Sequence, residues 1–343
     1  MASDGQRSIG RTASARESGG GHEHSTVVGE EQIESIDEAS TAPLPALAPL
    51  RDRVLTMVAI ILPTLGVVTA AFTVWGWGFQ WVDLGLLLGM YAATMLAITV
   101  GFHRLFTHGA FETNRLTQLL FAVVGSMAVQ GSLFHWVAVH RRHHQFSDKA
   151  NDPHTPYPLK GGWRGLLKGI WHAHIGWFFE ADTPNISRYV HDLEKSRALR
   201  VVSRLFPLWI VLGLALPAAL GGWMTGTWRG ALTGLIWGGL VRVFVVYHIS
   251  WSINSACHLW GARPFESGDL SRNNFLFGVL AMGEGWHNTH HAFPNSARHG
   301  LRWWQLDASY WLIKALSWMK LAWNLRLPSE QAQTLKRRLA PAR

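Results

Sequence analysis

The strongest constraint on this chain is a set of four apolar segments, each long enough to cross a membrane. They occupy residues 54–75, 82–102, 202–223 and 230–250. A spanning helix needs about 20 predominantly apolar residues, and backbone polar groups inside lipid must find their partners within helices or closed barrels. Short links at 76–81 and 224–229 join the segments in pairs. The sequence therefore predicts an all-α integral membrane protein with four transmembrane helices in two hairpins.

A fifth stretch, residues 116–136, is nearly as apolar but contains polar side chains, among them Gln118, Ser126 and Gln130. Polar groups at membrane depth are costly. We therefore expect this stretch to form a helix that lies in the membrane interface or re-enters the membrane without crossing it.

The basic residues predict which side of the membrane each part of the chain occupies. The hairpin links contain no Lys or Arg until Arg229. The segments that flank the hairpins are rich in them: Arg51, Arg53, Arg104, Arg115, Arg141, Arg142, Lys149, Arg197, Arg200 and Arg204. By the positive-inside rule both termini and the large central loop are cytoplasmic. The net charge of +9 then reflects topology, and we expect no nucleic-acid partner.

The composition divides the chain into three parts. Residues 1–47 are rich in Ser, Gly, Glu and Ala without an apolar period, which is typical of a disordered tail. We expect residues 48–325 to form one membrane domain with a cytoplasmic helical cap, and residues 326–343 a basic C-terminal tail. A single cysteine, Cys257, leaves no Cys-based metal cluster, so any bound metal is held by nitrogen and oxygen.

Nine histidines form a pattern typical of metal ligands. Eight fall into three clusters and one stands alone: His103 and His108; His140, His143 and His144; His287, His290 and His291; and His258. Residues three and four apart share one face of an α-helix. Each HxxHH cluster therefore points one way, and Asn254 faces the same way as His258. The five-residue separation of His103 and His108 suits the end of a helix that runs into a loop.

A lone histidine is more often a hydrogen-bonded core residue, but this repeated pattern favours metal binding. The nine can meet on the cytoplasmic side, provided that residues 116–136 do not cross the membrane. Imidazole suits Zn, Cu, Fe and Ni alike. Zinc normally takes four ligands, so two ions with five or six positions each fit nine histidines better.

Ligating histidines need an acceptor for their second ring nitrogen. Candidates for that supporting role are Asp148, Asp152, Asp269 and Glu284, with His154 nearby. The remaining histidines, including His248 and His299, lack a partner pattern, and we interpret them as ordinary hydrogen-bonded residues.

Four phrases around the histidines carry a resemblance to a known family. They are GFHRLFTH, HRRHHQFSDKANDPH, NSACH and GEGWHNTHHAFPNSARHGLRWWQ. Together with the apolar segments they resemble the membrane fatty-acyl desaturases of the stearoyl-CoA desaturase type, over residues 82–304. The resemblance implies two irons (Fe²⁺) held by nine histidines, with a tenth position filled by a water that an asparagine orients. The implied ligands here are His103, His108, His140, His143, His144, His258, His287, His290 and His291, with Asn254 holding the water.

The resemblance also implies the reaction, in which O2 is the co-substrate and is reduced to water. The product is a cis double bond, at delta-9 in this type, in a long acyl chain. We expect an apolar tunnel between the spans to position that chain. Tyr91 and Met95, one helical turn apart, are candidates for the closed end of the tunnel.

Acyl-CoA-specific relatives carry an Arg-Asp pair just before the second histidine cluster, where this chain has Ala138 and Val139. The carrier therefore stays open between CoA and a membrane lipid.

The sequence contains no haem-binding His-Pro-Gly-Gly, no Cys cluster and no glycine-rich dinucleotide motif. We therefore expect electrons from a separate protein of the ferredoxin or cytochrome b5 type, attracted by basic loops on the cytoplasmic face. Two alternatives remain at this point: a di-iron lipid hydroxylase, and a membrane metal-binding or transport protein.

Metal content distinguishes an oxygen-using enzyme from a metal transporter. We expect the purified protein to hold two tightly bound irons per chain, because nine histidines exceed the needs of a zinc site. Elemental analysis after dialysis measures this directly. Exchangeable zinc, or no retained metal, would contradict the enzyme interpretation.

Overall fold

The structure, a computed structural model, describes residues 47–157, 162–181 and 185–337 and is mostly helical there. In this part of the chain, four helical segments are long and apolar enough to cross a membrane: Leu50–Trp75, Trp81–Thr107, Phe206–Thr225 and Trp228–Leu259. This confirms the four predicted spans and their pairing into hairpins. The second and fourth spans, at 27 and 32 residues, run further than predicted toward the histidine-bearing part of the chain.

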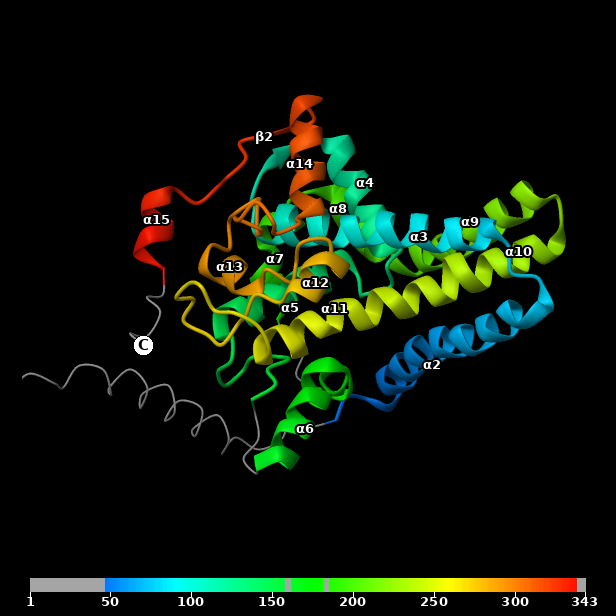
Figure 1. Ribbon diagram of the computed structural model, residues 1–343, viewed down its shortest axis with the longest axis horizontal. Coiled ribbons are helices and arrows are strands. Elements are labelled where there is room, and N and C mark those ends of the chain that lie inside the picture. Colours follow the sequence, from blue (N-terminus) through cyan, green and yellow to red (C-terminus); the bar gives the residue numbers. More distant parts are fainter. Residues whose placement is uncertain (1–46, 158–161, 182–184, 338–343) are drawn as a thin grey trace, which may run out of the picture.

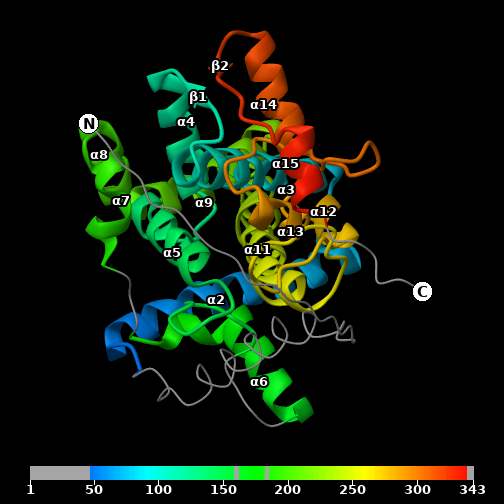
Figure 2. The same cartoon turned by 90° about the vertical axis from the view of Figure 1, so that its left-hand side faces the viewer.

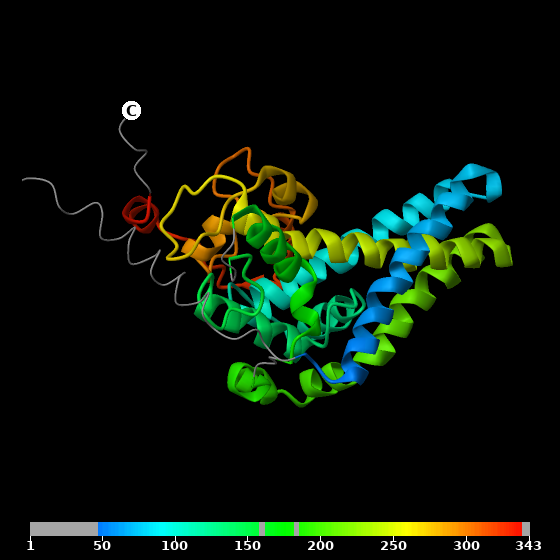
Figure 3. The same cartoon turned by 90° about the horizontal axis from the view of Figure 1, so that it is seen from below.

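The spans combine α-helices with π-helical stretches. In chain order their elements are α2 (Leu50–Phe72), η1 (Thr73–Trp77), α3 (Trp81–Leu96), η2 (Ala97–Thr107), α9 (Phe206–Thr225), α10 (Trp228–Gly234), η4 (Leu235–Val241) and α11 (Arg242–Leu259). Figures 1 and 3 show both hairpin links at the end of the bundle away from the rest of the molecule. The chain therefore leaves the second and fourth spans at the same end, where the histidines lie.

The other elements form what we call the cap (residues 108–205 and 260–337). They are β1 (Glu112–Thr113), α4 (Arg115–Ser126), α5 (Leu133–Phe146), α6 (Gly162–His174), η3 (Gly176–Phe179), α7 (Ile186–Glu194), α8 (Arg197–Arg204), α12 (Phe275–Leu280), α13 (His287–Ala292), α14 (Ala308–Trp318), β2 (Ala322–Trp323) and α15 (Glu330–Leu335). The two short strands pair antiparallel, with Glu112 opposite Trp323. Seen from the cap end, α6 and α14 lie on opposite sides of the cap (Figure 2).

The fifth apolar stretch differs from its prediction. As expected, it is not one of the helices long enough to cross a membrane. It is also not the single helix that we expected. The helix α4 ends at Ser126 and α5 begins at Leu133, and the backbone between them is irregular. Val129 and Gly131 adopt positive φ values of 63° and 99° there, which an α-helix cannot accommodate. Polar side chains in this stretch, Ser126 and Gln130 among them, thus lie at an interruption of the helix.

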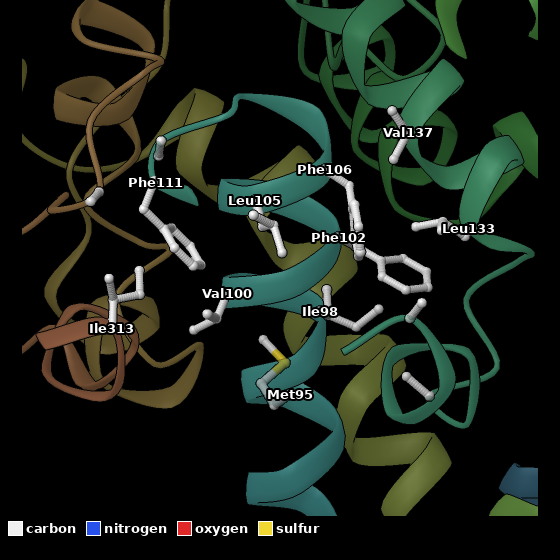
Figure 4. Close-up of a cluster of buried hydrophobic side chains, with 14 of the residues drawn as sticks. Met95, Ile98, Val100, Phe102, Leu105, Phe106, Phe111, Leu133, Val137 and Ile313 are labelled. Carbon is white, nitrogen blue, oxygen red and sulfur yellow. The ribbon is translucent and has the colours of Figure 1, made fainter. Parts of the chain in front are cut away.

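The hydrophobic core surrounds η2, and every residue of η2 is buried. Figure 4 shows this element between two apolar groups, Phe111 with Ile313 on one side and Leu133 with Val137 on the other. The core thus joins the second span to α5 and α14. Such packing holds the end of η2, which carries His103, in a fixed place.

The two ends of the chain differ in what can be described. Residues 1–46 of the predicted disordered tail lie outside the described residues, as do residues 338–343. The predicted basic tail is folded back onto the cap as far as Arg337, which bridges to Phe265. Lys336 also donates from Nζ to the carbonyl oxygen of Ala292 at 2.7 Å. This segment therefore covers the end of α13.

The second hairpin depends on glycines that let α9 and α10 approach closely. A Cβ atom at Gly221 would overlap the carbonyl oxygen of Gly230, and one at Gly234 would overlap the carbonyl oxygen of Pro217. Small residues at such crossings permit backbone contact between membrane helices.

We expect Gly221→Ala to destabilise the protein by about 1–3 kcal/mol, because the added methyl group forces the two helices apart. The midpoint of thermal unfolding in detergent measures the change. Gly89→Ala on α3 is the matched control, since a Cβ there meets nothing within 4 Å. Equal midpoints for the two variants would contradict this close packing.

Candidate metal centre

The nine predicted histidines meet in two groups. The first contains His103, His108, His140, His144 and His290, and the second contains His143, His258, His287 and His291. Within each group the facing ring nitrogens lie within 4.8 Å of one another. Residues far apart in the sequence are therefore gathered by η2, α5, α11 and α13 at one end of the bundle.

Each HxxHH cluster serves both groups. On α5, His140 and His144 belong to the first group, while His143 belongs to the second. On α13 the pattern is reversed, because His287 and His291 belong to the second group and His290 to the first. Each of the two helices therefore contributes histidines to both groups. The sequence alone did not show this division, since all three positions lie on one helix face.

His103 and His108 are brought together by a π-helical turn at the end of η2, where the helix runs into a loop as expected. The backbone N–H of His108 donates to the carbonyl of His103, five residues earlier, at 3.2 Å. Bonds from residue i to i+5 define a π-helix, and such turns occur often at functional sites. The two rings lie 4.9 Å apart between centroids. The five-residue spacing therefore matches the periodicity of η2.

Four buried carboxylates orient four of the rings by accepting from their Nδ1 atoms. The distances are 2.9 Å from His143 to Asp152, 2.9 Å from His258 to Asp148 and 2.6 Å from His291 to Asp269. His103 pairs in the same way with Glu284. These are the four carboxylates proposed from sequence as supporting groups. A proton held on Nδ1 leaves the Nε2 lone pair free for a metal.

The Nε2 atoms face one another at short range. His290 Nε2 lies 3.0 Å from His103 Nε2 and 2.8 Å from His144 Nε2. One proton cannot form two straight hydrogen bonds, so direct hydrogen bonding does not explain this geometry. Ligands about 2.1 Å from a metal and at right angles lie about 3.0 Å apart, whereas tetrahedral ligands lie about 3.4 Å apart. The spacing therefore fits ligands at right angles better than tetrahedral ones.

The second group gives a similar result. His258 and His287 approach at 3.0 Å between their Nε2 atoms. Within the described residues, the Nε2 atoms of His143 and His291 are buried and have no hydrogen-bond partner. Buried polar atoms without partners are rare in folded proteins. A cation at the centre of each group would satisfy them.

The charges and pKa values around the groups also fit metal ions. Burial, reinforced by neighbouring imidazoles, lowers the pKa well below its usual range for His108, His140, His143, His144, His287 and His290. These rings are therefore neutral, the form that binds metals. The four carboxylates beside them would add favourable charge to cations held between the rings.

His299 is a buried member of the site that we had interpreted as ordinary. Its Nδ1 lies 3.2 Å from a guanidinium nitrogen of Arg104, and its ring lies 4.5 Å from that of His290. Arg104 also contacts Glu284 at 3.3 Å and Asp307 at 2.9 Å. This network fixes the carboxylate that orients His103. Sequence spacing could not have connected Arg104 with His299, because the two residues lie nearly 200 positions apart.

An apolar cavity adjoins both groups, with an empty volume of about 770 Å³ that includes its open mouth. His103 and His140 of the first group and His287 of the second line it, as does Asn254. Met95, which we predicted to lie at the closed end of a tunnel, also lines this cavity. Tyr91 is absent from the lining residues, and its hydroxyl instead donates to the carbonyl of Leu280.

The cavity wall contains a polar bridge that we did not predict as part of the site. The Gln130 amide nitrogen donates to Ser250 Oγ at 2.7 Å, and Gln130 Oε1 accepts from Trp136 Nε1 at 3.3 Å. All three residues line the cavity. The sequence feature that could have indicated this bridge is the polar side chain of Gln130 within an apolar stretch.

Comparison with known proteins connects these features to a family. The Fatty acid desaturase family matches residues 79–324. A hex-5-enoyl-(acyl-carrier protein) acetylenase from Moorena producens (strain JHB) is 45% identical over 78% of this chain and 84% of that protein. The chloroplastic palmitoyl-monogalactosyldiacylglycerol delta-7 desaturase of Arabidopsis thaliana is 43% identical over 74% of this chain and 64% of its own length. An sn-1 stearoyl-lipid 9-desaturase of Synechocystis sp. is 39% identical, with 75% and 76% covered.

The carboxylates can be tested by their effect on metal retention. We expect Asp152→Asn to weaken metal binding about 10–100-fold, because the ring of His143 loses its charged acceptor. Metal remaining after a graded chelator challenge is the measurement. Asp52→Asn is the matched control, since Asp52 is exposed in the first turn of α2 and belongs to neither histidine group. Equal retention by the two variants would contradict an orienting role for Asp152.

Proposed function

Because this chain belongs to the membrane fatty acid desaturase family and is therefore an oxidoreductase acting on acyl chains, we propose that it is an O2-dependent desaturase with two irons. The single observation that carries this proposal is the convergence of nine histidines, in two groups, beside an apolar cavity that His103, His140 and His287 line. An apolar cavity admits an acyl chain, and the imidazoles provide a metal centre beside it.

In this proposal, His103, His108, His140, His144 and His290 hold one iron, and His143, His258, His287 and His291 hold the other. Asn254 lies in the cavity wall and would hold a water beside the smaller group. Bound in these groups, two irons would supply activation of O2, so that two hydrogens leave adjacent carbons and O2, with two electrons and two protons from outside, is reduced to two waters. The protein keeps the imidazoles neutral by burial and fixes their rings through the four carboxylates.

The cavity wall positions the chain and excludes water. Ile98, Val139 and Trp251 supply apolar contacts, and Met95 lies in the wall at the second span. Holding one carbon–carbon bond against the metals replaces a random encounter with a fixed geometry, which contributes a large part of a catalysed rate. We propose a cis double bond at delta-9, supported by the resemblance to the stearoyl type and by the Synechocystis relative.

We propose a membrane lipid as the carrier of the acyl chain. Ala138 is fully buried and Val139 is 7% exposed, so these positions offer no charged group to a nucleotide in solvent. Acyl-CoA-specific relatives have an Arg-Asp pair at this place. Two of the relatives named above act, by their names, on lipid-bound chains, which supports the same choice.

We also propose that the cap and both termini are cytoplasmic, and that a separate ferredoxin or cytochrome b5-type protein supplies electrons. Three of the five histidines in the first group are only partly buried, whereas all four in the second are buried. The first group is therefore closer to an external donor. Exposed Arg188 lies on α7, exposed Arg197 on α8 and exposed Lys195 between the two helices, both of which pack against α5. These charges suit an acidic partner.

Expression in a host that lacks unsaturated fatty acids, together with an electron-donor system, tests the proposal. We expect new chains lighter by two hydrogens, with the double bond at carbon 9, in the membrane-lipid fraction. Mass spectrometry of separated lipid, CoA and carrier-protein fractions measures this. We expect His143→Ala to be inactive, because a missing ligand leaves the centre incomplete, and Asp52→Asn to remain active.

Each other outcome identifies a different error. A gain of one oxygen would indicate a hydroxylase. Product confined to CoA or acyl-carrier protein would overturn the lipid carrier. An unchanged lipid profile with active electron donors would overturn the desaturase proposal itself.

A further inference from the structure

The irregular segment between α4 and α5, residues 127–132, is held by side chains of one spanning helix. Arg242 donates to the carbonyl of Met127 at 2.7 Å, and the Tyr247 hydroxyl donates to the carbonyl of Val129 at 2.8 Å. Ser250 accepts from the amide of Gln130 at 2.7 Å. Non-helical backbone at membrane depth requires such partners, because lipid offers none. The three contacts come from α11, so this helix fixes the path of the segment.

Val129 shows that this path is imposed on the segment. Its φ of 63° lies in the left-handed region, which a β-branched residue rarely adopts. A conformation of this kind persists only where the surrounding structure holds it, and it is often found beside functional sites. The hydrogen bond from Tyr247 acts on the same residue. Gln130, which lines the cavity, follows directly in the chain.

Burying the charged side chain of Arg242 to hold a backbone segment has a high free-energy cost. It is fully buried near the middle of the fourth span. Within the described residues its hydrogen bonds end on carbonyl oxygens: those of Met127, Gly213 at 2.8 Å and Gly238 at 3.2 Å. A buried arginine without a carboxylate is expensive in a membrane and is a functional hypothesis by default. Here it joins the end of α4 to α9 and α11.

Gln130 connects the segment to the metal centre. Its Oε1 accepts from Trp136, whose ring stacks on that of His140 at 5.0 Å between centroids with an interplanar angle of 19°. A shift of Gln130 therefore changes the shape of the cavity beside the first histidine group. A shift of about 1.5 Å, one carbon–carbon bond length, is enough to present a different bond of an acyl chain.

We propose that Arg242 and Tyr247 are positioning residues that set the depth of Gln130 in the cavity wall and thereby the position of the double bond. Neither residue lines the cavity, so each acts through residues 127–130. This inference rests on the proposed desaturase function and names the part of the fold that determines its regiochemistry.

The test is the distribution of double-bond positions in the product. We expect Tyr247→Phe, which removes one hydroxyl, to convert a single product into a mixture of neighbouring positional isomers. Arg242→Lys keeps the charge but loses the forked contacts, and we expect a larger spread. Tyr310→Phe on α14 is the matched control and should leave the position unchanged. Mass spectrometry of derivatised fatty acids locates each double bond. A purely structural role would lower the yield without changing the position.

A double-mutant comparison identifies the route of the effect. Gln130→Leu removes both hydrogen bonds of the bridge, so Tyr247→Phe should cause no additional change in that background. Equal isomer distributions for wild type and Tyr247→Phe would overturn the inference, and so would additive shifts in the double variant. If Arg242→Lys fails to accumulate, the Tyr247 and Gln130 variants still decide the question. A wild-type protein that forms no double bond would instead contradict the proposed function.

Discussion

The hydrogen bond from an imidazole Nδ1 to a buried carboxylate is the interaction on which the site depends. It occurs at His103, His143, His258 and His291, and in each case it directs Nε2 toward a group of similar atoms. The carboxylates are buried, and their charge would favour cations bound by the imidazoles. Orientation and charge therefore come from the same four contacts, and the rest of the cap serves to bring their partners together.

The membrane spans provide the frame for these contacts. Histidines at the end of η2 and in α11 belong to the second and fourth spans, which leave the bundle at the same end. Helices α5 and α13 supply most of the remaining histidines, and each helix contributes to both groups. The packing around η2 joins α5 and α14 to the second span (Figure 4). A change in the spacing of the spans would thus reach both histidine groups at once.

The sequence predicted the features that follow from periodicity and failed where they follow from contacts. Four apolar runs of sufficient length gave the spans, and the HxxHH spacing gave ligands on one helix face. The irregular backbone after Ser126 was missed, because apolar residues continue through it and the side chains of Arg242, Tyr247 and Ser250 that hold it lie far along the chain. His299 was missed for the same reason, since its partner is Arg104. Tyr91 shares a helix with Met95 but contacts Leu280, which helical spacing does not reveal.

The order in which the ligands occur along the chain has a consequence for biosynthesis. Both histidine groups need residues from α13, which follows the fourth span, and the segment around Lys336 covers the end of that helix. Neither group exists while only the two hairpins have been inserted. Until then the histidines of η2, α5 and α11 lack the imidazoles of α13 that complete both groups. Closing the long loop between α5 and α13 has an entropic cost. Both groups therefore form only when α13 docks against the rest of the cap.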